Sequence, residues 1–195
     1  MNMRKIIVTY DYDDVLAALN EYCIKALNLD KELITRFEVD KTLLSEEDKK
    51  KLLEYYRDIH SYESADWYDG IDDVVKISQD PRVDFRIHSH VISKEIKEYK
   101  RERLLAKGFK EECLNLQEGK EKEMQDTDIM VDDRILNLIK SPGKYKILYN
   151  QSWNQEPYHP EFKSNMRYMI RAKDLKQVNS LVEGIIEEWS TGQYN

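Results

Sequence analysis

The order of apolar and polar positions divides the chain into strand-like and helix-like segments that alternate. Four segments have the composition of buried or half-buried strands: residues 6–10, 83–91, 128–131 and 144–150. Apolar side chains recur at helical spacing in residues 15–29 and 172–189, which predicts amphipathic helices. Trp153 and Asn154 follow one of the strands; they could line the rim of a site, but are interpreted mainly as packing residues. Strands alternating with helices predict an α/β fold with a doubly wound, Rossmann-like parallel sheet.

Capping residues mark the ends of two further helices. Ser45, with Asp48 three positions later, has the pattern of a capping box. Ser93 is the expected N-cap of a helix that Gly108 ends. Acidic and basic residues alternate along this second helix at four-residue spacing, which is typical of an exposed face. Lys100 is therefore predicted to be a surface residue.

Carboxylates directly follow two of the predicted strands. Asp11, Asp13 and Asp14 end the first strand, and Asp132 and Asp133 end a later one. Parallel strands deliver their carboxyl ends to one edge of a sheet, where open α/β folds bind ligands. Closely spaced carboxylates repel each other unless a cation joins them, and Mg²⁺ prefers such oxygen ligands. These residues alone fit either a magnesium site or a polar connection from strand to loop with solvated aspartates.

Both acidic segments resemble motifs of one enzyme family. DYDDVLA, beginning at Asp11, resembles the Asp-x-Asp-x-Val/Thr motif of haloacid dehalogenase superfamily phosphatases, most closely the 5'(3')-deoxyribonucleotidase branch. That branch usually has glycine where this chain has Asp14. The resemblance implies that Asp11 is the nucleophile that takes the phosphoryl group and that Asp13 is the general acid and base. It also implies Mg²⁺ ligands at Asp11, Asp13 and Asp133, with Asp132 in a supporting position.

The family's two remaining motifs have weaker counterparts. The resemblance places Ser89, at the end of a predicted strand, on a phosphate oxygen. It also gives Lys122, ten positions before the acidic pair, the role of neutralising the nucleophile and binding the phosphate, with Lys120 as an alternative. In some family members a lysine at the place of Lys100 binds phosphate, but the charges around Lys100 favour the surface here. Alone, a strand-end serine is typical of a turn and a loop lysine is typically solvated. His88 and His90 have no evident third partner for a metal and are interpreted as core or rim residues.

A charged, helix-prone stretch separates the first strand from the next α/β unit. Residues 17–69 resemble the small helical cap of this phosphatase family, which leaves residues 1–16 and 70–195 as the core domain. Gly70 is the expected pivot at the return to the core. Caps exclude water and contact the unreactive part of a substrate. In the deoxyribonucleotidase branch, cap aromatics stack on the base, and Phe37 is the residue predicted for this role.

Composition limits the partners. The 195 residues suit one core with a small insertion. The excess of 38 Asp and Glu over 31 Lys and Arg, a net charge of −7, argues against nucleic acid polymers and anionic membranes. No apolar stretch approaches the roughly 20 residues of a membrane span, and no signal peptide is expected. Cys23 and Cys113 are expected to be reduced structural thiols. Together, these features predict a cytoplasmic protein.

These features predict a Mg²⁺-dependent, 5'-nucleotidase-like phosphatase that hydrolyses (deoxy)nucleoside monophosphates through an aspartyl-phosphate. The substrate is then a small molecule. Two alternatives remain: a phosphatase of the same type that acts on another small phosphomonoester, and a non-catalytic Mg²⁺-binding phosphoacceptor module. Asp13 argues against the second, because receiver-like modules lack an acid two residues after the nucleophile. The sequence leaves the base, the oligomeric state and the effect of Asp14 open.

Overall fold

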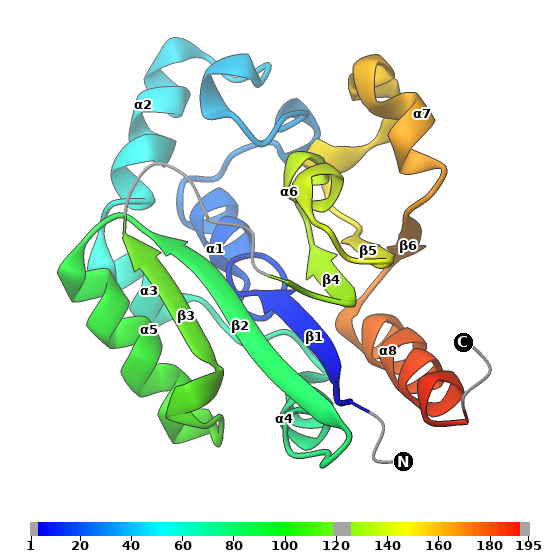
Figure 1. Cartoon of the computed structure of the whole chain (residues 1–195). Coiled ribbons are helices and arrows are strands. Elements are labelled where there is room, and N and C mark those ends of the chain that lie inside the picture. The colour runs from blue at the N-terminus through cyan, green and yellow to red at the C-terminus, as the bar shows by residue number, and fades with distance from the viewer. Residues whose placement is uncertain (1–3, 119–125, 192–195) are drawn as a thin grey trace.

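The computed structural model describes residues 4–118 and 126–191, which form one open sheet flanked by helices (Figure 1). Within these residues the sheet has six strands: β1 (Ile6–Asp11), β2 (Val83–Val91), β3 (Leu114–Glu118), β4 (Ile129–Asp132), β5 (Tyr145–Tyr149) and β6 (Ile170–Ala172). Their order is β3-β2-β1-β4-β5-β6, and every pairing is parallel. The predicted doubly wound α/β fold is confirmed.

The strand order reverses beside β1. The chain runs outward from β1 through β2 to β3, and then returns to β4 on the other side of β1. Tyr10 pairs with Ile87 of β2 and with Val131 of β4, so the carboxyl ends of the three strands lie at one edge. Open α/β sheets bind ligands at such a reversal. The acidic residues that end β1 and β4 therefore lie where this fold places its sites.

The helices are amphipathic and cover both faces of the sheet. Those of the described residues are α1 (Leu19–Ala26), α2 (Glu46–Tyr55), α3 (Ile59–Ser64), α4 (Ile71–Ser78), α5 (Lys94–Lys107), α6 (Ile135–Lys140), α7 (Lys163–Met166) and α8 (Leu175–Ser190). Helices α4, α5 and α8 share a hydrophobic cluster with Ile6, Val8 and Tyr10 of β1. Helix α6 packs against Met130 and Leu148 on the opposite face.

Short 3₁₀ helices occupy several of the connections. They are η1 (Lys31–Leu33), η2 (Val39–Lys41), η3 (Glu111–Cys113), η4 (Ser152–Asn154), η5 (Glu156–Tyr158) and η6 (Pro160–Phe162). Two of them, η2 and η4, lie next to the candidate site described below. Such single turns are common connectors because their hydrogen-bond geometry does not favour long runs.

Local sequence signals mark several helix ends. Ser45 accepts a hydrogen bond from a backbone N–H in the first turn of α2, and Ser93 does the same for α5. Gly108 ends α5 with φ +110°, which glycine adopts without steric cost. The helix predicted over residues 15–29 is shorter and begins at Leu19, because the residues before it form a hydrogen-bonded turn.

Residues 18–66, called the insertion from here on, leave and re-enter the rest of the chain at adjacent points of the backbone. Ala17 and Trp67 form an antiparallel bridge, flanked by backbone hydrogen bonds from Ala18 N to Asp66 O (2.9 Å) and from Tyr68 N to Leu16 O (2.9 Å). Its apolar residues form a separate hydrophobic cluster that also includes two core residues, Ile96 and Trp153: Leu19, Cys23, Ile24, Ile34, Val39, Leu44, Leu52, Tyr62, Ala65, Ile96 and Trp153. The division at residues 16 and 70 remains a sequence-based prediction.

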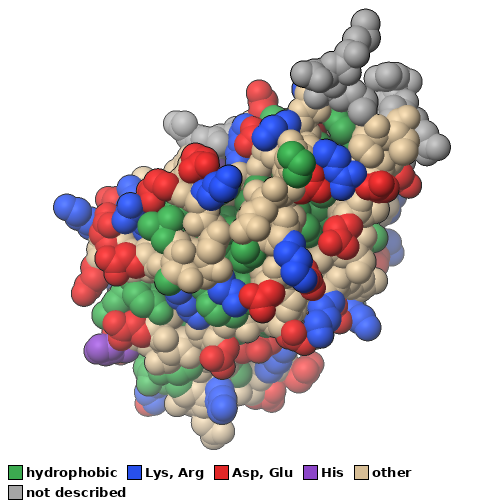
Figure 2. All heavy atoms as spheres, turned by 90° about the horizontal axis from the view of Figure 1, so that it is seen from below, with side chains coloured by type: hydrophobic (Ala, Val, Ile, Leu, Met, Phe, Trp, Pro, Cys, Tyr) green, Lys and Arg blue, Asp and Glu red, His purple; other side chains and the backbone are tan. Residues whose placement is uncertain are grey.

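The surface mixes charges of both signs. Figure 2 shows the molecule of Figure 1 from below, with acidic and basic side chains interspersed on this side. No basic stripe of the kind that binds a nucleic acid backbone gathers among the described residues drawn there. No helix in residues 4–118 or 126–191 is both long enough and apolar enough to span a membrane.

Two glycines predict opposite effects of the same substitution. Gly70 precedes α4 with φ +107°, and an added Cβ would lie 3.2 Å from Lys176 Cγ and from the Lys176 backbone nitrogen. Gly70→Ala should therefore lower the free energy of unfolding by about 1–2 kcal/mol. Gly184 lies within α8, and an added Cβ would have no atom within 4 Å apart from its chain neighbours and the backbone of its own helix, so Gly184→Ala should raise the free energy of unfolding by about 0.5–1 kcal/mol. Urea unfolding of both variants tests the pair, and equal shifts would contradict the assigned backbone constraint.

Candidate active site

A tight turn carries three aspartates across the carboxyl end of β1. Backbone hydrogen bonds from Leu16 N to Tyr12 O (3.0 Å) and from Asp14 N to Ala17 O (2.8 Å) close it. Asp14 adopts φ +57°, the left-handed conformation in which asparagine and aspartate are tolerated better than most residues. This conformation explains how the turn accommodates an aspartate where the resembled motif has glycine.

The two acidic segments meet in a buried carboxylate cluster. One oxygen from each of Asp11, Asp132 and Asp133 lies within 4.8 Å of the others. The exposed fractions of these residues are 6%, 0% and 1%. The meeting follows from the parallel pairing of β1 with β4, which brings the ends of both strands to the same edge. Segments that are more than 100 positions apart in the sequence thus converge on one point.

Hydrogen-bond donors orient the two aspartates at the end of β4. Asp132 accepts from the Arg134 backbone N–H at 2.8 Å and from Asn137 Nδ2 at 2.9 Å. Asp133 accepts from Trp153 Nε1 at 2.6 Å. Trp153 was predicted to pack, and it is buried as expected, but its indole N–H also holds an acid of the cluster. A strand-end tryptophan gives no sequence signal for that contact.

The cluster fits a divalent cation. Burial raises the pKa of the Asp133 carboxyl well above its usual range, and the charges of Asp132, Asp14 and Asp11 raise it further. A cation bound between the carboxylates would offset both effects. Asp11, Asp132 and Asp133 offer hard carboxylate oxygens, which are the ligands that Mg²⁺ takes, usually in combination with water and substrate phosphate.

Asp13 points to a different partner. Its Oδ2 accepts a hydrogen bond from Lys100 Nζ at 2.5 Å, and Lys100 also donates to Ser89 Oγ at 3.0 Å. Ser89 Oγ lies 3.4 Å from the same Asp13 oxygen. Asp13, Ser89 and Lys100 therefore form a second group of polar side chains at the same edge of the sheet. Asp13, predicted as a metal ligand, lies outside the carboxylate cluster in this arrangement.

The prediction that Lys100 is a surface residue is wrong. The side chain is 0% exposed, and its ammonium lies 4.9 Å from the centre of the Tyr12 ring and 5.0 Å from that of the Tyr62 ring. Lys100 shares the buried face of α5 with Ile96 and Leu104, four positions to either side. That spacing was a signal in the sequence, but the alternating charges around it favoured an exposed face.

Lys122 and Lys120, the lysines predicted to bind phosphate, lie outside the described residues. Ser89 is fully buried at the end of β2, beside the acidic turn. His88 is buried and His90 is partly buried, in agreement with their interpretation as core or rim residues. Among the described residues, the lysine that reaches the acidic turn is Lys100.

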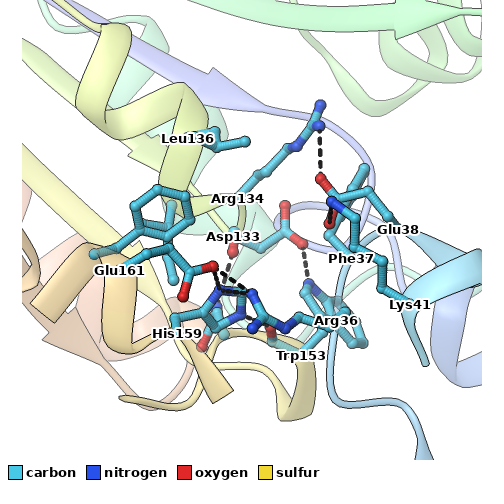
Figure 3. A pocket seen from close by; sticks show the side chains of 13 residues that line it. Arg36, Phe37, Glu38, Lys41, Asp133, Arg134, Leu136, Trp153, His159 and Glu161 are labelled. Carbon is cyan, nitrogen blue, oxygen red and sulfur yellow. Dashed lines mark hydrogen bonds and ion pairs between the residues drawn. The ribbon is translucent and has the colours of Figure 1, made fainter. Parts of the chain in front are cut away.

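A small pocket opens beside Asp133, between the insertion and the core (Figure 3). Its volume is ≈ 60 Å³, well below the roughly 300–1,000 Å³ of typical small-molecule sites. Phe37 lines it and is 42% exposed, with the Arg134 guanidinium 4.5 Å from its ring centre. The lining residues are Arg36, Phe37, Glu38, Lys41, Asp133, Arg134, Ile135, Leu136, Trp153, Asn154, His159, Glu161 and Phe162.

Ion pairs on both sides of Phe37 connect the insertion to the core. Arg36 Nη1 lies 2.6 Å from Glu161 Oε1, and Glu38 Oε1 lies 3.2 Å from Arg134 Nη2, as the dashed lines of Figure 3 show. All four residues of these pairs line the pocket. A substrate larger than the pocket would therefore need these side chains or the insertion to move.

Comparison with solved structures identifies the fold. Predicted phosphatases from Clostridium difficile and Clostridium acetobutylicum are similar to this chain, with TM-scores of 0.54 and 0.51 and sequence identities of 13% and 14%. The alignments cover 92% and 95% of this chain and 99% and 100% of those proteins. A haloacid dehalogenase-like family hydrolase from Streptococcus pneumoniae has a TM-score of 0.50 at 12% identity, over 92% of this chain and 98% of that one.

The chain has the fold of a haloacid dehalogenase-like hydrolase. No family model and no curated protein matches the sequence. The similarity therefore concerns the fold, and the chemistry of the site has to be argued from its own residues. In this haloacid dehalogenase-like fold, the carboxylate cluster and the Lys100 group lie at the strand reversal.

If the cluster binds Mg²⁺, Asp133→Asn should raise the melting temperature without Mg²⁺ and remove its response to Mg²⁺. Removing one of three crowded charges should raise the melting temperature of the metal-free protein by about 2–4 °C for each kcal/mol of repulsion relieved. The rise that Mg²⁺ causes in the wild type by binding the folded state should disappear. Differential scanning fluorimetry with a Mg²⁺ titration measures both effects.

The exposed Asp72→Asn variant, on α4, is the matched control and should respond to Mg²⁺ like the wild type. A Mg²⁺ response in Asp133→Asn equal to that of the wild type would remove Asp133 from the ligand set.

Proposed function

We propose that the protein is a Mg²⁺-dependent phosphatase that hydrolyses small phosphomonoesters through an aspartyl-phosphate, with (deoxy)nucleoside monophosphates as the first substrates to test. One observation carries the proposal. The acidic turn supplies Asp11 to a buried carboxylate cluster and Asp13 to a buried lysine and serine, all at the strand reversal. Phosphoryl transfer to a carboxylate needs both a nucleophile and positive charge to offset the repulsion between two anions.

Each residue has a role that its surroundings support. Asp11 attacks phosphorus, forms the acyl phosphate bond and displaces the ester oxygen; water then cleaves the acyl phosphate and regenerates the carboxylate. Bound between Asp11, Asp132 and Asp133, Mg²⁺ would supply Lewis acidity to the phosphate oxygens. Lys100 and Ser89 donate hydrogen bonds toward the transferring group. Lys100 and Ser89 are both fully buried, and electrostatic interactions are stronger where water is excluded.

Asp13 is placed to move protons in both steps. The side chain as a whole is 27% exposed, but Oδ1 is buried and has no hydrogen-bond partner among the described residues, while Oδ2 is held by Lys100. We assign to this unpaired Oδ1 the protonation of the departing ester oxygen and, in the second step, the uptake of a proton from the attacking water. Because Lys100 holds Oδ2, the carboxylate keeps its orientation while Oδ1 gives and takes the proton.

The pocket bears on the substrate. Phe37 lines it and is 42% exposed, which supports a planar group such as a base at this position. Its volume of ≈ 60 Å³ favours instead a smaller phosphomonoester unless the insertion moves. Both substrates use the same chemistry, so the choice between them concerns only the residues of the insertion and of the segment that includes Glu161.

The direct test is release of inorganic phosphate from an aryl phosphate, with Mg²⁺ and with a chelator, followed by a panel of nucleoside monophosphates and sugar phosphates. Turnover that requires Mg²⁺ is expected. The panel separates the nucleotide from the smaller esters. A protein that takes up one phosphoryl group from an aryl phosphate and keeps it would instead be a phosphoacceptor module, and the proposed hydrolase would be wrong.

A further inference from the structure

The side chain of Asp14 is hydrogen-bonded to the insertion. It is buried, and it accepts hydrogen bonds from the Asn20 backbone N–H at 2.8 Å and from Asn20 Nδ2 at 2.5 Å. Asp14 is thus bound to the first turn of α1, the first helix of the insertion. The carboxylate cluster consists of Asp11, Asp132 and Asp133 and does not include it.

Asn20 passes the contact on to a second helix of the insertion. Its Oδ1 accepts a hydrogen bond from the hydroxyl of Tyr56, which follows the last residue of α2. The backbone oxygen of Tyr56 in turn accepts from the hydroxyl of Tyr62 at 3.0 Å, and the Tyr62 ring lies over the Lys100 ammonium. A continuous path therefore runs from Asp14 through the insertion to the lysine that holds Asp13.

The main chain of Asp14 is fixed as well. Its carbonyl oxygen accepts from Gln151 Nε2 at 2.9 Å, and its N–H donates to the Ala17 carbonyl oxygen at 2.8 Å. Both sides of the residue are thus tied, one to the core and one to the insertion. Because Asp14 directly follows Asp13 on the turn that begins at Asp11, its position sets where both catalytic carboxylates lie.

We infer that Asp14 is a positioning residue that couples the insertion to the catalytic turn through Asn20 and Tyr56, and that it is not a metal ligand. A glycine at this position would suit the left-handed conformation better but would have no side chain for the contact. The inference deepens the proposed function and rests on it for its kinetic consequence. A loosened turn misplaces the nucleophile, and small misplacements are costly in rate.

The sharpest comparison is between Asp14→Gly and Asp14→Asn. Asparagine keeps the shape and tolerates the left-handed conformation. Its Oδ1 can accept from the Asn20 backbone N–H, and after the Asn20 amide rotates, Nδ2 donates to Asn20 Oδ1 while Asn20 Nδ2 donates to the Tyr56 hydroxyl. Asp14→Asn should therefore keep kcat near the wild-type value, whereas Asp14→Gly should lower kcat about tenfold with KM little changed.

Tyr56→Phe removes the hydrogen bond from the Tyr56 hydroxyl to Asn20 and should lower kcat by roughly a third to a half as much on a logarithmic scale. Tyr55→Phe, at the last residue of α2, is its control and should match the wild type. In the double variant Asp14→Gly with Tyr56→Phe, kcat should equal that of Asp14→Gly alone, because the first change already breaks the path. Urea unfolding of the same four-member cycle should show the same non-additivity.

The outcomes separate the two proposals. Loss of the Mg²⁺-dependent rise in melting temperature in Asp14→Asn would make Asp14 a ligand and overturn the inference, as would wild-type kcat in Asp14→Gly or additive effects in both cycles. An inactive wild type would overturn the proposed function. The coupling of Asp14 to Tyr56 through Asn20 would still be measured by the urea unfolding of the four proteins, which does not depend on activity.

Discussion

Asp11→Asn should abolish turnover while leaving the fold intact. Asparagine fills the same volume at the end of β1 but cannot form the acyl phosphate. In another enzyme, loss of the nucleophile cost about six orders of magnitude in kcat, and we expect a loss of at least about four here. The measurement is phosphate release from an aryl phosphate at saturating Mg²⁺, with circular dichroism to show that the helices and the sheet are retained.

The matched control for Asp11→Asn is again Asp72→Asn, which makes the same chemical change on the exposed surface of α4 and should keep wild-type turnover. Trapping strengthens the test. Acid-quenched wild type incubated with a labelled phosphomonoester should carry an alkali-labile phosphoryl group, and Asp11→Asn should not. Turnover of Asp11→Asn at the wild-type rate would exclude the covalent mechanism.

Lys100→Met should lower kcat/KM by about 10²–10³, the cost commonly seen when one donor to a developing negative charge is removed. Methionine has a similar unbranched side chain that can fill the same buried space beside Ile96 and Leu104, but it carries no charge. The free energy of unfolding should also fall, by about 1–3 kcal/mol, because removing one partner of a buried ion pair leaves Asp13 and Ser89 without their donor, while the partial exposure of Asp13 limits the cost. A loss of activity of this size in a variant that remains folded by circular dichroism distinguishes a catalytic lysine from a structural one.

Lys122→Met is the natural comparison for Lys100→Met, because the sequence resemblance assigned the phosphate-binding role to Lys122. If Lys100 has that role, Lys122→Met should retain most of the activity. Steady-state kinetics of both variants under the same conditions decide the matter. Full activity in Lys100→Met combined with a large loss in Lys122→Met would restore the sequence-based assignment.

The sequence predicted the fold because the relevant patterns are local. The apolar run of β1 and the caps of α2 and α5 are legible within a few residues, and each is present in the structure. Alternation of strands and helices then limits the topology to a small set. The convergence of Asp11 with Asp132 and Asp133 followed from the rule that parallel strands end at one edge.

What the sequence did not predict depends on contacts between distant segments. Lys100 was assigned to the surface because acids and bases alternate around it, whereas its burial depends on Tyr12 and Tyr62 closing over it. The hydrogen bond from Trp153 to Asp133 likewise depends on a loop that follows β5. Local propensity carries no information about such contacts, since they are decided by tertiary packing.

The bridge between Ala17 and Trp67 bears on how this protein could diversify. Because both ends of residues 18–66 meet at neighbouring backbone positions, another segment could be exchanged there without changing the register of any strand of the sheet. A graft would need to supply apolar cover for Ile96 and Trp153, which the present insertion buries. Evolution, or a protein engineer, could in this way alter which substrates enter the pocket while the carboxylate cluster stays unchanged.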